Sequence, residues 1–168
     1  MNDKAFRLIN QLSGRVLPID LLMIFLSNKV RYLFLFVLLL MWIRKGSYRF
    51  SAFNSVLSAG FSLIIYFIIK LFYFKPRPFI KHRVGILIPS KVDSTFPSKH
   101  TMLVFAISTA IYLRERILGL IMLIISGLTG ISRIWVGHHY PFDIIGSAII
   151  ASVTSILFNK VNQNDYVN

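Results

Sequence analysis

The chain has no cysteine and only six acidic residues in 168 positions. Without cysteine it can form no disulfide, offer no thiolate to a metal and use no cysteine nucleophile. The six acids stand against nineteen lysines and arginines, which gives a formal net charge of +13. The N-terminus also lacks a short apolar core followed by a small-residue cleavage site, so we expect no removable signal peptide.

Apolar residues, by contrast, make up 55% of the chain, and the mean hydropathy is +0.67. Several apolar stretches approach the length of about twenty residues that crosses a bilayer. These features predict an all-α integral membrane bundle that forms one domain over residues 1–168. The basic residues lie between the apolar runs, so we expect membrane lipids and anionic substrates as partners, and no nucleic acid.

The apolar pattern predicts six transmembrane helices after an N-terminal interfacial helix in residues 1–14. In that first stretch Phe6, Leu8, Ile9 and Leu12 recur at helical spacing with polar residues between them. A rival count joins the first two spans into one long tilted helix, which would place the charged stretch 28–31 inside the membrane. The six expected spans cover residues 16–27, 32–43, 50–69, 101–113, 117–131 and 144–158.

Charge alone does not orient this bundle. With both termini in the cytoplasm, the nineteen basic residues divide almost evenly between the two sides, so the positive-inside rule gives no preference. If several of the outer charges bind phosphate, the rest weakly favour cytoplasmic termini. We therefore expect the basic, proline-punctuated stretch 70–99 to form an extracytoplasmic active-site loop.

The first chemical cluster is "KLFYFKPRPF", which begins at Lys70 at the end of the third expected span. A lysine in that position is usually a residue whose ammonium group reaches the membrane surface. Arg77 is more informative, because Pro76 and Pro78 stiffen the backbone on both sides of it. A guanidinium held in this way suits bidentate binding of a phosphoryl group.

The second cluster is "FPSKHTM", in which Ser98 is a good N-cap for the fourth expected span. The free N–H groups of a first helical turn bind anions, and His100 lies within that turn. The alternative interpretation is an ordinary helix cap followed by an interfacial histidine.

The third cluster, "SRIWVGHHYPFD", contains Arg133, two histidines and a carboxylate. Pro141 suits the first position of the last helix, which places His139 at the positive end of that helix. Asp143 follows one turn later, so we expect its carboxylate to contact the His139 ring and fix one tautomer, leaving the other nitrogen free to attack. The alternative is that these residues only decorate a membrane interface.

Together the clusters supply cations, a capped helix, two histidines and an orienting carboxylate at span ends on one side of the membrane. This inventory is typical of phosphoryl transfer. Two alternatives remain open. A divalent metal bound by histidine and aspartate is disfavoured by the surrounding basic residues, so we expect no metal and no cofactor. A non-enzymatic lipid transporter is disfavoured because transporter sites usually lie at mid-bilayer.

These motifs resemble the type 2 phosphatidic acid phosphatase superfamily, whose pattern is K-x6-RP, then PSGH, then SR-x5-H-x3-D. The stretches "YFKPRPF" and "GLTGISRIWVGHHYPFD" are very similar to those of the bacterial bacitracin-resistance undecaprenyl-diphosphatases within it. Lys99 departs from the pattern, which has glycine there, and an added ammonium would attract a second phosphate. The positions that match are Lys70, Arg77, Pro78, Pro97, Ser98, His100, Ser132, Arg133, His139 and Asp143.

The resemblance implies a role for each matching residue. His139 would be the nucleophile that forms a phosphohistidine, oriented by Asp143, and His100 would protonate the leaving group and then activate water. The phosphoryl oxygens would be held by Lys70, Arg77, Ser98, Lys99 and Arg133. His138 has no counterpart in the pattern and is expected beside the site or at the interface.

The resemblance also implies a substrate and a location. The substrate would be undecaprenyl diphosphate, cleaved at the outer face of a bacterial plasma membrane as part of lipid-carrier recycling for the cell wall. Phosphatidic acid and phosphatidylglycerophosphate remain alternatives, because the same catalytic residues serve their phosphatases.

Overall fold

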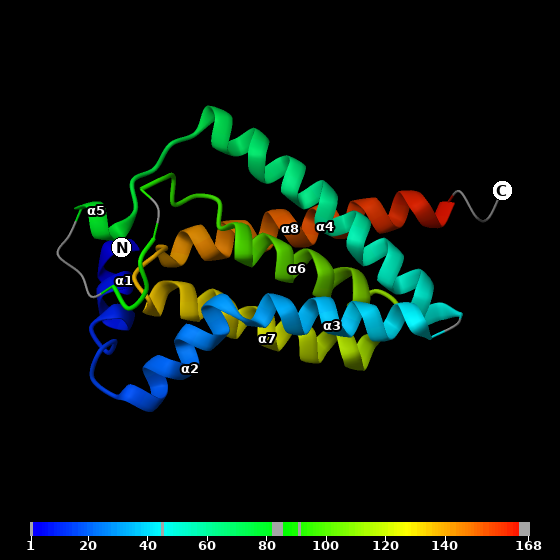
Figure 1. The fold of residues 1–168 in the computed structure, drawn as a ribbon. Helices are drawn as coiled ribbons and strands as arrows, with labels where there is room; N and C mark the ends of the chain where they lie inside the picture. The colour runs from blue at the N-terminus through cyan, green and yellow to red at the C-terminus, as the bar shows by residue number, and fades with distance from the viewer. Residues whose placement is uncertain (1, 45, 82–85, 91, 165–168) are drawn as a thin grey trace.

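A computed structural model of the chain describes residues 2–44, 46–81, 86–90 and 92–164. Within these ranges the regular secondary structure consists of helices joined by loops, with no strand (Figure 1). The four residues 82–85 and residue 91 of the expected active-site loop lie outside the described residues. The helices are α1 (Asn2–Asn10), α2 (Leu17–Asn28), α3 (Val30–Ile43), α4 (Ser47–Phe72), α5 (Pro78–Lys81), α6 (Lys99–Tyr112), α7 (Arg116–Trp135) and α8 (Pro141–Asn164).

The long helices form a bundle in which α6 packs against α4, α7 and α8. Helix α6 is buried on most of its faces, since Met102, Val104, Ala106 and Ile111 are all almost fully covered. Its small residues allow its neighbours to approach closely, which is how helices associate in lipid. The outer helices instead expose large apolar side chains, as expected for surfaces that face lipid tails.

The prediction of an all-α, multi-pass bundle is confirmed, but the count of six spans is not. Three helices, α4, α7 and α8, are each long and apolar enough to cross a membrane. Helices α2 and α3 meet that condition only together, as a pair bent by 51°. Helix α6 has 14 residues, a length of about 21 Å that is shorter than the hydrocarbon core of a bilayer.

The α2–α3 pair changes the expected topology. The polar stretch at Asn28 does interrupt the helix, but the chain bends there and continues instead of turning back. Helix α1 consequently packs at the end of the bundle where α7 ends and α8 begins: the Phe6 and Tyr140 rings are 5.4 Å apart, and the Asn10 amide donates to the Trp135 carbonyl at 2.9 Å. Figure 1 shows α1 at one end of the bundle and the end of α8 at the other. The expectation that both termini lie in the cytoplasm stays a prediction, and the position of α1 and the end of α8 at opposite ends of the bundle does not favour it.

Candidate active site

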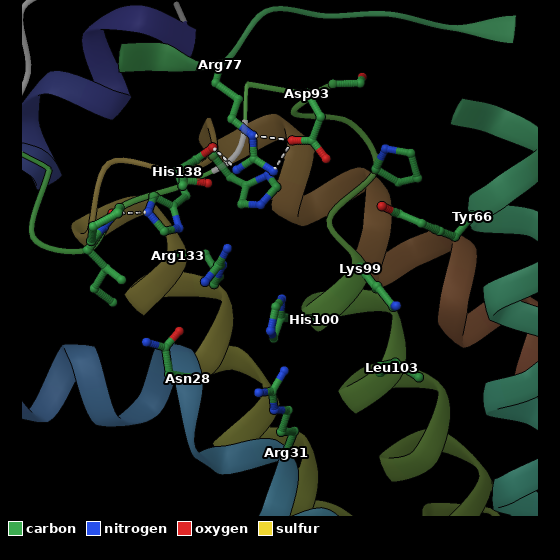
Figure 2. A pocket seen from close by; sticks show the side chains of 16 residues that line it. Asn28, Arg31, Tyr66, Arg77, Asp93, Lys99, His100, Leu103, Arg133 and His138 are labelled. Atoms are coloured by element: carbon green, nitrogen blue, oxygen red, sulfur yellow. Dashed lines mark hydrogen bonds and ion pairs between the residues drawn. The ribbon is translucent and has the colours of Figure 1, made fainter. Parts of the chain in front are cut away.

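A cavity of about 510 Å³ opens at the end of the bundle that carries α1 and α5. Its walls come from the α2–α3 break, the loop before α6, the first turn of α6 and the α7–α8 connection. All three sequence clusters contribute to it, so the predicted convergence is found. The polar side chains that line it include Asn28, Arg31, Arg77, Asp93, Lys99, His100, Arg133, His138 and His139, several of which are labelled in Figure 2.

His139 lies in the short connection between α7 and α8 and is only 3% exposed. Its Nδ1 is 2.6 Å from the Thr95 carbonyl oxygen. A carbonyl only accepts hydrogen bonds, so Nδ1 carries the proton and the lone pair of a neutral ring is on Nε2. Within the described part of the chain Nε2 has no hydrogen-bond partner, and the ring lines the cavity.

The surroundings of His139 favour its neutral form. Burial is the largest cause that lowers its pKa well below the usual range, and the positive charges of Arg133 and Arg77 lower it further. The hydrogen bond to Thr95 acts in the opposite direction and does not outweigh them. An uncharged imidazole with a free Nε2 is what a nucleophilic histidine requires.

The predicted direct contact between Asp143 and the His139 ring is wrong. Asp143 Oδ2 instead accepts from the Tyr140 N–H at 3.1 Å and from the Thr95 hydroxyl at 2.8 Å, and Oδ1 pairs with Lys75. The reason is local: a carboxylate at the third position of a helix folds back onto the N–H of the capping residue. Thr95 therefore connects the two groups, since its hydroxyl also lies 3.2 Å from His139 Nδ1.

Two of the three cations of the first cluster, Lys70 and Arg77, meet on Asp93. Lys70 Nζ lies 2.6 Å from Asp93 Oδ2, and Arg77 Nη2 lies 2.7 Å from Asp93 Oδ1. Partial burial acts to raise the pKa of Asp93, but the hydrogen bonds from Lys70 and Arg77 outweigh it and leave the pKa below its usual range. Arg77 also donates from Nη1 to the His138 carbonyl at 3.2 Å, which ties the loop to the α7–α8 connection.

In the second and third clusters, Arg133 and Lys99 line the cavity, whereas Ser98 lies behind its wall. Arg133 is buried, lines the cavity and donates from Nη1 to Ser27 Oγ at 2.7 Å. Ser98 is the N-cap of α6, as predicted, but its side chain makes no capping hydrogen bond. Its hydroxyl accepts from Thr101 at 3.0 Å and its N–H donates to Ser147 Oγ at 2.7 Å, behind the cavity wall. Lys99 lines the cavity near Phe67, with Nζ 5.9 Å from the ring centre.

His138 is buried next to His139 and lines the same cavity. Its Nε2 lies 2.8 Å from the Ile88 carbonyl and so carries the proton. Burial, followed by the charge of Arg133, lowers the pKa of His138 to about 4. It is a neutral support that holds the loop before α6 against the α7–α8 connection.

Sequence reasoning missed four residues of this site: Thr95, Lys75, Asn28 and Arg31. Lys75 lies inside the K-x6-RP motif, two positions before Arg77, and Asn28 and Arg31 belong to the polar stretch that interrupts the first apolar region, so these three residues had a faint signal. Thr95 had none, because its contacts are made by residues more than forty positions away in sequence.

The sequence matches a known family and several named relatives. Residues 51–166 match the PAP2 superfamily. The chain is 40% identical over 94% of its length, and 82% of the relative's, to undecaprenyl-diphosphatase BcrC of Bacillus subtilis (strain 168). It is 32% identical over 94% of its length, and 78% of the relative's, to a protein of Bacillus licheniformis named bacitracin transport permease protein BcrC.

Two solved structures share the fold. The crystal structure of Aquifex aeolicus LpxE superposes with a TM-score of 0.80 at 26% identity, covering 95% of this chain and 94% of that one. A PAP2-type phosphatidylglycerolphosphate phosphatase from Bacillus subtilis superposes with a TM-score of 0.72 at 17% identity, covering 96% and 86%. The second likeness bears on the fold alone.

Proposed function

Because this chain belongs to the PAP2 superfamily and is a multi-pass membrane lipid phosphatase, we propose that it hydrolyses undecaprenyl diphosphate to undecaprenyl phosphate. The proposal of this substrate rests on the two relatives named BcrC, one of which is an undecaprenyl-diphosphatase. It further places the enzyme in a bacterial plasma membrane with the cavity on the extracytoplasmic side. The product would be the lipid carrier that is reused in cell-wall synthesis. Its regeneration by this hydrolysis would contribute to bacitracin resistance.

The observation that carries the proposed chemistry is the state of His139. Its Nδ1–H donates to the Thr95 carbonyl, its Nε2 has no hydrogen-bond partner among the described residues, and it shares one cavity with His100 and three guanidinium groups. A lone pair on a fixed imidazole next to clustered cations suits attack on a phosphorus atom whose oxygens are held by those cations.

In the proposed first step, His139 Nε2 attacks the distal phosphorus and the bond to the bridging oxygen breaks. His100 gives its proton to that oxygen, which leaves on the lipid phosphate. In the second step His100 takes a proton from water, the resulting hydroxide attacks the phosphorus, and the P–N bond breaks to release phosphate. Both steps develop charge on phosphoryl oxygens, which Arg77, Lys99 and Arg133 would stabilise.

Asp93 has a defined part in this proposal. Its carboxylate occupies Lys70 and Arg77 in the substrate-free protein, so it keeps both cations in place before substrate binds. An incoming phosphoryl group carries more negative charge and more acceptor oxygens than a carboxylate. It would therefore share or replace Asp93 on these two side chains.

The name of the Bacillus licheniformis relative raises transport as a second reading. The charged cavity lies at one end of the bundle, whereas transporter sites lie near the bilayer midplane between repeated halves. The position of the cavity thus favours a reaction at the membrane surface.

The proposed function is tested by comparing turnover of the purified protein on undecaprenyl diphosphate, phosphatidic acid and phosphatidylglycerophosphate at equal mole fraction in detergent micelles. We expect the highest kcat/KM on the diphosphate, unchanged by excess chelator, and loss of at least about a thousandfold in the His139→Ala variant. Preference for either monophosphate would refute the substrate. Activity lost to chelator and restored by added metal would refute the metal-free chemistry.

A further inference from the structure

We infer that Arg31, together with Asn28, forms a second phosphate subsite that binds the lipid-proximal phosphate of a diphosphate substrate. The inference deepens the proposed function, on which it rests, by identifying what distinguishes a diphosphate from a monophosphate in this cavity. Neither residue belongs to the three motifs that point to the reaction.

The cavity holds more positive charge than one phosphoryl group requires. Four cationic side chains, those of Arg31, Arg77, Lys99 and Arg133, line it, and Asp93 is the single acid among the residues that line it in the described part of the chain. A monophosphate ester carries about −1.5 to −2 charge near neutral pH. In Figure 2 Arg77 and Arg31 lie at opposite ends of the group, with Arg133 and His100 between them. One phosphate bound near Arg77 would leave the Arg31 end empty.

The break between α2 and α3 is what places Arg31 at the cavity. Helix α2 ends at Asn28, α3 begins at Val30, and the 51° bend directs the first turn of α3 past the site. Ser27 anchors the break, since its hydroxyl accepts from Arg133 Nη1 at 2.7 Å. Asn28, the last residue of α2, and Arg31, in the first turn of α3, therefore both line the cavity at this break.

Arg31 is also available to bind an anion. Its guanidinium lies 5.0 Å from the centre of the Tyr32 ring and donates to the Tyr32 hydroxyl at 3.3 Å. Across the residues that the structure describes, the ion pairs involve Lys70, Lys75 and Arg77, and Arg31 has no carboxylate partner. A guanidinium that rests on an aromatic face and keeps most of its donors free is suited to bidentate binding of phosphate.

The proposed reaction requires a group that stabilises the leaving lipid phosphate, and Arg31 is placed to do so. When the bond between the distal phosphorus and the bridging oxygen breaks, negative charge develops on the phosphate that stays with the lipid. Arg31 lies on the side of His100 away from Arg77 (Figure 2), so it would hold that leaving phosphate while His100 protonates the bridging oxygen. A monophosphate ester has no second phosphate for Arg31 to bind.

The test compares Arg31→Gln with the wild type on undecaprenyl diphosphate and on phosphatidic acid. Loss of a charge-assisted bidentate contact should lower kcat/KM on the diphosphate by about 10- to 100-fold. The decrease on phosphatidic acid should be at least about tenfold smaller. Arg31→Lys keeps the charge but loses the planar guanidinium, so its kcat/KM on the diphosphate should lie between those of the wild type and Arg31→Gln. An intermediate value also shows that the loss in the glutamine variant is not a folding defect.

Lys29→Gln is the matched control, because Lys29 is a cation at the same break that does not line the cavity; it should leave both substrates unaffected. An equal decrease on both substrates in Arg31→Gln, or none, would overturn the subsite.

A second experiment, on inhibition by inorganic diphosphate and phosphate, tests the subsite even if the proposed substrate is wrong. Inorganic diphosphate should inhibit turnover of phosphatidic acid by the wild type more strongly than inorganic phosphate does, and Arg31→Gln should remove that difference. If the wild type does not hydrolyse undecaprenyl diphosphate but Arg31→Gln removes the difference in inhibition, the proposed substrate is refuted and the subsite stands. An unchanged inhibition ratio would refute the subsite whatever the substrate.

Discussion

At the scale of single residues, the central feature is the chain of contacts behind His139. The Thr95 carbonyl fixes the ring, and the Thr95 hydroxyl links it to Asp143, which Lys75 neutralises. In the Ser-His-Asp arrangement a carboxylate contacts the imidazole directly, whereas here a backbone carbonyl does so. A carbonyl fixes the tautomer without placing a full negative charge beside the ring. The protonated imidazolium is therefore less stabilised, and the neutral form is favoured.

Thr95→Val should test this link. The variant keeps the carbonyl and the side-chain shape but removes the hydroxyl, leaving one oxygen of the buried Asp143 with one acceptor bond fewer. We expect kcat to fall about tenfold with little change in KM, a loss of about 1–2 kcal/mol in positioning. Thr95→Ser should restore most of the rate. A valine variant with wild-type kcat would show that the hydroxyl does not position the nucleophile.

The pH dependence follows from the depressed pKa of His139. The nucleophile acts in its neutral form, so activity persists as pH falls below the usual histidine range and is lost only near the depressed pKa. Arg77→Gln removes one of the charges that lower this pKa, so the pKa should rise and the acid limb of the kcat/KM profile should move to higher pH. Arg114→Gln, at the opposite end of the bundle, should not move it. An acid limb that is identical in Arg77→Gln and wild type would contradict this electrostatic account.

At the scale of the helices, local signals in the sequence were sufficient for the elements that carry the motifs. Ser98 as a cap and Pro141 as a first helical residue predict the starts of α6 and α8, and the structure confirms both. The α2–α3 bend could not be predicted, because a polar interruption is compatible with a turn between two spans or with a kink in one. Thr95 could not be found either, since its role depends on a loop folding against the far end of the chain.

The α6–α7 hairpin supports the site by holding α6 in the middle of the bundle. At Gly119 an added Cβ would lie 2.2 Å from the Tyr112 Cα, a backbone atom that cannot move aside. Gly119→Ala should therefore destabilise the protein by about 1–3 kcal/mol, seen as a lower Tm in detergent. Gly127→Ala on the same helix, where nothing lies within 4 Å, should leave Tm unchanged or slightly higher. Equal Tm values for the two variants would show that the hairpin is not packed this closely.

At the scale of the whole molecule, the arrangement separates α1 and the end of α8 across the bundle. The absence of cysteine makes this testable by labelling single introduced cysteines with a membrane-impermeant maleimide. Lys4→Cys in α1 should react in intact cells, on the side of the active site, and Lys160→Cys in α8 only after permeabilisation. Both positions are exposed. Labelling of the two from the same side would contradict the placement of α1 and the end of α8 on opposite sides of the membrane.

The measurement that tests the account most directly is the isolation of the phosphorylated enzyme. In His100→Ala the second step should be slowed more than the first, because a phosphate is a good leaving group whereas water needs a base. Brief incubation with undecaprenyl diphosphate, rapid quenching at alkaline pH and peptide mass spectrometry should find the phosphoryl group on His139. Phosphorylation of another residue, or turnover with no phosphorylated enzyme at any time, would contradict a nucleophilic His139.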